Sequence, residues 1–317
     1  MEYCVTLNPT IDKTIELDEL SMGTVNRARS VSRRAGGKAI NVALILKALG
    51  RDPKVVGVNS REEGELLRNA LEANSIFYEF HDVNGPARVN TKIVDRANGK
   101  VTEVNELGLD VADDLLERIS DEVYNDADTG EAVVLAGALP PNAPVSYYAD
   151  LARRLKTKGV RVVVDASGQA LAEALKAQPY MIKPNLSELR ELTGAPIKTV
   201  GELREACEKL MKEYDIEIVL VSLGNKGAFM ASREGQYYSP ALALEVTTTV
   251  GGGDSIVAGA VAYMDTTPAQ MLRSGAAAAA GTLAAQGMGL CTSDLFNTYY
   301  GQVSIEEPQA DMLLIEP

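Results

Sequence analysis

Histidine and cysteine are scarce in this sequence. His81 is the single histidine among 317 residues, which excludes a metal site built from several histidines and leaves only this imidazole for a Ser-His-Asp triad. Cys4, Cys207 and Cys291 lie far apart and match neither a disulfide framework nor a zinc-binding spacing. This cysteine usage predicts a reducing environment, and we expect a cytoplasmic protein.

Positive charge is also in short supply, since 31 lysine and arginine residues face 44 aspartate and glutamate residues. The formal net charge of -13 argues against sequence-independent binding to nucleic acid or to an anionic membrane surface. An anionic substrate must therefore meet a local basic pocket. No apolar run is long enough to span a bilayer, and no basic segment precedes an apolar one at the start, so we expect neither membrane anchor nor signal peptide.

The sequence does contain 46% hydrophobic residues, in a chain long enough to bury a large core. From residue 111 onward, apolar strand-like runs alternate with amphipathic helix-like segments, which indicates a parallel sheet covered by helices on both faces. The predicted helices are 113–124, 145–159, 170–178, 187–194 and 201–214, and the predicted strands between them are 132–139, 160–167 and 180–185. Later runs, 216–232 and 236–241, predict partly antiparallel strands, and a short helix with a weakly structured end is expected from Ser293.

Two segments leave this alternation. Residues 10–35 and 87–107 each alternate polar and apolar positions, as exposed strands do. In the second segment, Asn98-Gly99 joins two such runs and favours a hairpin. We expect the two segments to pair as one small β-sheet that forms a lid on the main domain.

The stretch TTTVGGGDSIVAGAVAYM, residues 247–264, predicts a strand, a glycine turn and a helix. Gly251, Gly252 and Gly253 let bare backbone amides approach a ligand, and the helix directs its positive dipole end at the same point. Asp254 follows them, where a carboxylate can accept a proton from a hydroxyl beside a bound phosphate. An anion site next to an acceptor suggests phosphoryl transfer, although such turns are also common as structural elements with an aspartate N-cap.

Several well-known nucleotide-binding signatures are missing. The chain has no Walker A loop and no protein-kinase signature, because GGKA at 36–39 lacks the upstream glycine and the hydroxyl residue that binds magnesium. A dinucleotide-binding oxidoreductase is disfavoured because no GxGxxG turn follows the first strand. Ligands of open α/β sheets gather beyond the carboxyl ends of the strands, so residues at these ends are candidates for one cleft. They include Asn8, Asp12, Asp165, 183–185 and 222–224.

Five motifs point further: NPTID at 8–12, GGKAIN at 36–41, KPNLSEL at 183–189, SLGNKGA at 222–228 and TTTVGGGDS at 247–255. Together they resemble the phosphofructokinase B branch of the ribokinase-like carbohydrate kinases, which holds 1-phosphofructokinases and tagatose-6-phosphate kinases. The resemblance covers nearly the whole chain. It implies a three-layer αβα sandwich with a mainly parallel sheet, in one kinase domain, 1–317, whose discontinuous β-sheet lid comprises about 10–35 and 87–107.

The resemblance and the chemistry of the residues together suggest roles in the site. Asp254 would be the catalytic base, with the amides of Gly251, Gly252 and Gly253 as the anion site. Sugar-phosphate ligands would be Asp12, Arg27, Gly36, Gly37, Lys38, Asn41, Arg88 and Asn90, and nucleotide ligands would be Lys183, Asn185, Ser222, Gly224, Asn225, Lys226 and Gly227. A guanidinium binds phosphate bidentately, although the basic residues between 27 and 38 would equally suit a solvated face.

Magnesium is implied as a cofactor beside ATP. Asn185 and Glu188 would hold it through water, because this ion gives up its hydration shell reluctantly. The alternative for this pair is a helix-capping pattern.

We therefore expect an ATP-dependent kinase that converts fructose 1-phosphate to fructose 1,6-bisphosphate, with tagatose 6-phosphate or fructose 6-phosphate as the alternative substrate. Ala39 and Gly252 replace a glycine and an alanine of the family pattern, and 136–139 lacks its serines. Since Ala39 would be strained at a position requiring positive φ, a non-catalytic sugar-phosphate sensor is a second hypothesis, opposed by the presence of Asp254. Exposed edges and one apolar face of the lid, together with the resemblance, predict a homodimer through the lid.

Overall fold

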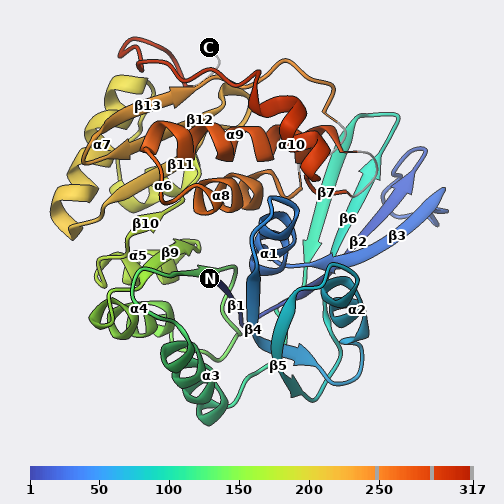
Figure 1. Cartoon of the computed structure of the whole chain (residues 1–317). Helices are drawn as coiled ribbons and strands as arrows, with labels where there is room; N and C mark the ends of the chain where they lie inside the picture. Colours follow the sequence, from blue (N-terminus) through green and yellow to red (C-terminus); the bar gives the residue numbers. More distant parts are fainter. Residues whose placement is uncertain (247–249, 286–288, 315–317) are drawn as a thin grey trace.

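The computed structural model describes residues 1–246, 250–285 and 289–314, and its larger sheet has nine strands (Figure 1). In order across the sheet they are β13 (Gly235–Ser239), β12 (Ala228–Ser232), β11 (Ile218–Ser222), β10 (Met181–Ile182), β9 (Arg161–Asp165), β8 (Ala132–Ala136), β1 (Glu2–Thr6), β4 (Pro53–Ser60) and β5 (Phe77–Val83). Neighbouring strands pair in parallel across β11, β10, β9, β8, β1, β4 and β5, whereas β12 and β13 are antiparallel additions at one edge. The mainly parallel sheet is confirmed, as is the antiparallel character of the last strands.

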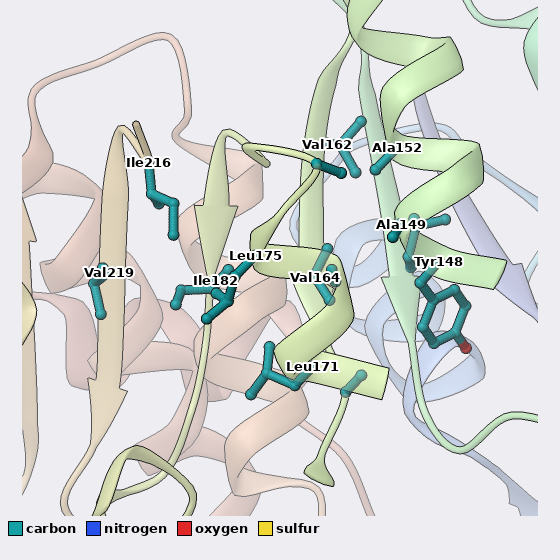
Figure 2. Packing of buried hydrophobic residues seen from close by; sticks show 14 of the residues in the cluster. Tyr148, Ala149, Ala152, Val162, Val164, Leu171, Leu175, Ile182, Ile216 and Val219 are labelled. Carbon is teal, nitrogen blue, oxygen red and sulfur yellow. The ribbon is translucent and has the colours of Figure 1, made fainter. Parts of the chain in front are cut away.

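Helices cover both faces of this sheet. One face carries α1 (Lys38–Ala48), α2 (Glu65–Ala73), α8 (Gly252–Ala262), α9 (Pro268–Ala284) and α10 (Ser293–Tyr300), and the other carries α3 (Asp113–Asp126), α4 (Tyr147–Thr157), α5 (Gly168–Leu175), α6 (Leu186–Thr193) and α7 (Val200–Tyr214). The β9 valines show why both layers form, since Val162 and Val164 enter one apolar core and Val163 enters the other. Figure 2 shows Val162 and Val164 against Ala149 and Ala152 of α4. The predicted three-layer αβα sandwich is confirmed.

A separate four-stranded sheet, the lid, projects from one side of the main sheet (Figure 1). Its order is β3 (Ser30–Gly36), β2 (Thr10–Leu17), β6 (Arg88–Asp95) and β7 (Lys100–Asn105). Strands β2 and β6 pair in parallel, so the two excursions of the chain meet at the centre of the lid. The hairpin predicted at Asn98-Gly99 joins β6 to β7 and is confirmed.

The last described residues contact the edge of the main sheet and the segment before α7. Glu306 and Tyr238 of β13 exchange two backbone hydrogen bonds of 2.8 and 3.0 Å, and Leu313 forms an isolated bridge with Thr199 before α7. The short helix expected from Ser293 is present as α10, and residues 301–314 after it form no further helix or strand but are held by these contacts. Edge-strand backbone groups of β13 gain partners when this segment pairs with them. Residues 315–317, at the end of the chain, lie outside the described residues.

Further expectations concern the single histidine, the cysteines and membrane-spanning helices. His81 lies in the edge strand β5, and its Nε2 is 2.7 Å from a carboxylate oxygen of Glu122. Cys4, Cys207 and Cys291 are buried and form no disulfide. No helix in the described ranges is long and apolar enough to cross a membrane. The strand predicted at 247–249 lies outside the described residues.

Candidate active site

Neighbouring strands of the main sheet bring polar residues to the same edge. Asp165 ends β9, Lys183 follows β10 and Ser222 ends β11, while Asn8 follows β1. The Asn8 side-chain amide donates to the carbonyls of Leu107, after the lid, and of residue 139, after β8, at 2.8 and 3.1 Å. Parallel strands therefore gather these groups beneath the lid, as expected for an open α/β sheet.

The glycines for which the sequence predicts an anion site lie at the N-terminus of α8. Gly251 is the N-cap with φ of 80°, and a Cβ there would lie 2.9 Å from Leu290 Cδ2, so this position needs glycine. Gly252 and Gly253 are the first helical residues, whose amides have no partner within the helix. A Cβ on Gly253 would lie 3.6 Å from Lys183 Nζ, so an ammonium stands beside the same amides. We call Gly251, Gly252 and Gly253 the anion nest.

Asp254 is the third residue of α8, so the structural alternative of an aspartate N-cap is wrong. Its side chain is buried, and Asn41 Nδ2 donates a 2.7 Å hydrogen bond to its Oδ2. Burial, together with the nearby charge of Asp165, raises the pKa of Asp254 to about 6, although Lys38, the Asn41 hydrogen bond and Lys183 act in the opposite direction. A carboxylate with this pKa is ionised near neutral pH and can still accept a proton.

Two lysines converge on Asp165, a residue at a strand end that was not among the predicted ligands. Lys38 Nζ is 2.7 Å and Lys183 Nζ is 3.3 Å from Asp165 Oδ1, and the aspartate is fully buried. Burial alone would lower the pKa of Lys38, but the charges of Asp165 and Asp254 raise it above its usual value. The Lys38 ammonium is therefore held charged, and both lysine side chains lie at Asp165, between the anion nest and the predicted sugar site.

Two glycines, Gly36 and Gly37, precede α1, and Gly36 leaves room for the Asp12 side chain. Asp12 Oδ1 accepts a 2.9 Å hydrogen bond from Thr10 Oγ1, and any Cβ at Gly36 would overlap with the Asp12 carboxylate. Gly37 is the N-cap of α1 with φ of 101°, a conformation that favours glycine. Both glycines are thus required locally, and they bring Asp12 next to the start of α1, which carries Asn41.

Arg34 joins these residues, and the sequence reasoning left it out of the site. Its Nη2 is 3.1 Å from Asp12 Oδ2, and its Nη1 donates to Asn41 Oδ1 at 3.1 Å. Only the register of the lid reveals this role: Asp12 on β2 lies directly opposite Arg34 on β3 and Asn90 on β6. Pairing across a sheet joins residues that local sequence patterns do not link.

The lid places the remaining predicted sugar-phosphate ligands unequally. Asn90 Oδ1 is buried and has no hydrogen-bond partner in the described part of the chain, and Asn90 shares a cavity of about 100 Å³ with Asp12. Arg88 is half-buried, and its Nε donates to the Glu106 carbonyl at 2.7 Å. Arg27 lies in the exposed segment between β2 and β3, away from these contacts, with no hydrogen bond or ion pair to the described residues. The structure thus brings Asn90 and Arg88 to the site but leaves Arg27 in solvent.

A larger cavity of about 500 Å³ opens on the other side of the anion nest. Its wall includes Gly252 and Gly253, the apolar residues Leu242, Leu244, Ile256 and Leu283, and the predicted nucleotide ligands Asn185, Ser222, Gly224, Asn225 and Gly227. Lys226 does not line it, and the Lys226 carbonyl accepts a 2.5 Å hydrogen bond from Tyr238. An apolar cavity that ends in backbone amides suits a nucleotide, with its base in the apolar part and its phosphates at the nest.

Asn185 and Glu188 form a reciprocal capping box at the start of α6. Asn185 Oδ1 accepts from the Glu188 amide, and Glu188 Oε2 accepts from the Asn185 amide, both at 2.8 Å. The pair keeps Glu188 Oε1 for a further contact, and no group of three or more His, Cys, Asp or Glu side chains in the described ranges could hold a metal ion by itself. These donors fit a magnesium ion that arrives with the nucleotide phosphates and touches the chain through water.

The departures from the family pattern do not strain the backbone. Ala39 is a buried residue of α1 without positive φ, so the concern that it would be strained was wrong. Gly252 has helical geometry that alanine would also accept. In the turn after β8, Gly137 has φ of 97° and its amide donates to the Asp165 carbonyl at 3.0 Å. The main structural argument for the non-catalytic sensor hypothesis is therefore removed.

Comparisons with known proteins identify the family of this chain. The family model described as pfkB family carbohydrate kinase matches residues 5–295. A 1-phosphofructokinase of Xanthomonas campestris pv. campestris is 36% identical over 82% of this chain and 83% of its own, and a tagatose-6-phosphate kinase of Staphylococcus epidermidis is 30% identical over 97% and 100%.

Solved structures give the same fold. Escherichia coli phosphofructokinase-2 in complex with potassium has a TM-score of 0.88 and 25% identity, over 95% of this chain and 98% of that one. Arabidopsis thaliana ribokinase with ribose and ATP has a TM-score of 0.77 and 23% identity over 94% and 98%, which shows the fold alone. The fold is ribokinase-like, and the chain is a phosphotransferase with an alcohol as acceptor. Within that class, the chain belongs to the pfkB family of carbohydrate kinases.

Proposed function

We propose that this kinase transfers the γ-phosphoryl group of ATP to fructose 1-phosphate and forms fructose 1,6-bisphosphate. The observation that carries the proposal is the position of Asp254. This buried carboxylate is held by Asn41 between the anion nest and the face of the lid that carries Asp12 and Asn90. A sugar hydroxyl bound by Asp12 and Asn41 would lie between Asp254 and the nucleotide phosphates. Nucleotide and sugar then approach the nest from opposite sides.

The residues divide the chemistry between them. Asp254 accepts the proton of the attacking hydroxyl, whose oxygen forms a bond to the γ-phosphorus while the bond to the leaving ADP oxygen breaks. The amides of the nest and the Lys183 ammonium stabilise negative charge on the transferred group. Magnesium, when bound with the nucleotide near Asn185 and Glu188, neutralises charge on the phosphates. Positioning of the hydroxyl makes a large contribution, since this transition state requires little covalent work from the protein.

A phosphorylated sugar is supported by the cations around the predicted sugar site. Arg88 of the lid and Lys38 of α1 are candidates for its phosphate, and Asn90 offers to a hydroxyl an acceptor that has no partner among the described residues. The Xanthomonas relative named 1-phosphofructokinase supports fructose 1-phosphate. Tagatose 6-phosphate, or fructose 6-phosphate, is the alternative, supported by the Staphylococcus relative that matches 97% of this chain.

Turnover on a substrate panel tests this proposal. Fructose 1-phosphate, fructose 6-phosphate, tagatose 6-phosphate and unphosphorylated fructose are each incubated with ATP and magnesium, and ³¹P NMR identifies the product. We expect the highest kcat/KM with fructose 1-phosphate. A higher value with tagatose 6-phosphate would overturn the substrate assignment, and preference for unphosphorylated sugar would overturn the role of Arg88 and Lys38. Ligand binding without turnover on any sugar would favour the non-catalytic sensor.

We also propose a homodimer formed through the lids of a cytoplasmic enzyme. Strand pairing aligns Val31, Ile15 and Ile93 in one row across β3, β2 and β6, on the face opposite Asp12 and Asn90. Val31 is 54% exposed, and Val104 of β7, on the same face, is 56% exposed. The lid of a second subunit would cover this apolar face and the sheet edges in a symmetric homodimer.

A further inference from the structure

Arg34 lies at the junction of the lid and the helices that carry the site. It stands near the end of β3, and its guanidinium contacts both Asp12 of β2 and Asn41 of α1. Asn41 in turn contacts Asp254 of α8. A continuous chain of three contacts therefore runs from the predicted sugar-binding carboxylate to the predicted base, through one guanidinium and one amide.

The direction of these contacts fixes the amide of Asn41. A guanidinium only donates hydrogen bonds, so the atom of Asn41 that faces Arg34 must be the carbonyl oxygen. The NH₂ group is then the one that faces Asp254, at 2.7 Å, and it stabilises the ionised carboxylate. Without Arg34, the amide is free to rotate by 180° and to offer its oxygen to Asp254. That orientation favours the protonated form of Asp254, which cannot act as a base.

The surroundings of Arg34 indicate that it is held for this geometry. Its side chain is 16% exposed, and its Nε is buried without a hydrogen-bond partner in the described part of the chain. A buried donor without a partner costs stability, so packing alone does not account for an arginine here. Arg33, the preceding residue, is exposed and lies on the opposite face of β3. The two arginines thus have the same charge but different surroundings.

We propose that Arg34 is a positioning residue that holds the Asn41 amide in the orientation that keeps Asp254 ready to accept a proton, and that it couples this orientation to Asp12. The inference rests on the proposed roles of Asp254 as base and Asp12 as sugar ligand. It does not depend on which ketohexose phosphate is the substrate. Arg34 acts through Asn41 and has no direct contact with Asp254.

Other charged groups around Asp254 stay in place when Arg34 is replaced. Asp165 approaches from the end of β9, Lys38 from α1 and Lys183 from the segment after β10. None of them contacts Arg34, whose partners in the described part of the chain are Asp12 and Asn41. A change in the titration of Asp254 in an Arg34 variant would therefore come through Asn41, since the nearest charges are unaltered.

The test compares R34Q with R33Q, which removes the same charge from the other face of β3. For each, kcat/KM is measured from pH 5 to pH 8 with the best substrate of the panel, and thermal unfolding and sugar-phosphate binding are recorded. We expect R34Q to lower kcat/KM at pH 8 by about tenfold and to move the acid limb of the profile upward by about half a pH unit. R33Q should follow the wild type in both respects.

R34K is a second variant that tests the proposal if R34Q does not fold. Lysine retains the charge for Asp12 but is a single point donor that cannot replace the two-pronged contact. We expect R34K to bind the sugar phosphate better than R34Q while its acid limb remains shifted. An unshifted limb in both variants would overturn the proposal, because a purely structural role lowers only the amount of active enzyme. No turnover by the wild type would instead overturn the proposed function, and this role with it.

Discussion

Asn41 Nδ2 and Asp254 Oδ2 lie 2.7 Å apart although 213 residues separate them in the sequence. The contact joins α1, which follows the first lid segment, to α8, which begins at the anion nest. Both partners are buried, so water does not compete for the bond. The candidate base is thus held from the sugar side of the site, while its own helix presents the amides of the nest.

Replacing Asp254 by asparagine should separate binding from chemistry. D254N keeps the shape of the side chain and an oxygen for the Asn41 amide, but it removes the acceptor for the hydroxyl proton. We expect kcat to fall by roughly 10²–10⁴-fold while the affinity for sugar phosphate and ATP stays within a few-fold. Steady-state kinetics and isothermal titration calorimetry check this. Turnover close to that of the wild type would show that Asp254 is not the base.

The same substitution should stabilise the protein above pH 6. The folded pKa of Asp254 is raised to about 6, so its ionised form costs about 2–3 kcal/mol in the folded state relative to the unfolded chain. D254N removes this cost. The gain in unfolding free energy should be complete above about pH 6 and should shrink as the pH falls toward 4, where the wild-type carboxyl becomes protonated. Denaturant unfolding at pH 8 and pH 4.5 checks the trend, and a pH-independent difference would contradict it.

Asp165 should tune the pH dependence in the direction opposite to Arg34. Its charge raises the pKa of Asp254, so D165N should lower that pKa and move the acid limb of kcat/KM to lower pH. Lys38 and Lys183 lose their shared partner, and we also expect weaker stability. A pH profile of the variant, restricted to conditions where circular dichroism shows it folded, tests the shift. A limb at higher pH would be the contrary result.

Gly36 should tolerate no side chain. A methyl group at this position would overlap with the Asp12 carboxylate and displace it from the sugar site. We expect G36A to raise KM for the sugar phosphate by about tenfold or more, with little change in KM for ATP. G301A is the matched control, because Gly301 follows α10, has ordinary backbone geometry and meets nothing within 4 Å. Equal sugar KM values for the two variants would argue against a sugar contact of Asp12.

The apolar face of the lid should determine the oligomeric state. V31E places a charge on this face, and V104E does the same on the outer strand. We expect either variant to convert a dimer into monomers in multi-angle light scattering, because an unpaired charge would be buried in the interface. F77E introduces the same charge at a 78% exposed position of β5, outside the lid, and should leave the dimer intact. A monomeric wild type would refute the dimer.

The sequence was most informative where function depends on neighbouring residues in the chain. The glycine turn before Asp254 predicts its own helix start, because backbone freedom and helix dipole act locally. Arg34 was missed as a site residue for the opposite reason, and for the same reason Asp165 was expected at the cleft without a specific role. Arg34 reaches Asp12 through strand register, and Asp165 meets Lys38 only once the sheet order is known. Contacts of this kind depend on tertiary structure, and the hydrophobic periodicity of a single segment does not predict them.

The position of β1 between β8 and β4 in the main sheet has a consequence for biosynthesis. One neighbour, β4, leaves the ribosome shortly after it, but the other, β8, begins only at Ala132. Likewise, β2 of the lid has no parallel partner until β6 has been synthesised. Asp254 and the nest come after three quarters of the chain, so we expect a nascent chain to complete its sheets before it acquires the means to transfer phosphate. Premature release before α8 would yield a core without the catalytic end of the site.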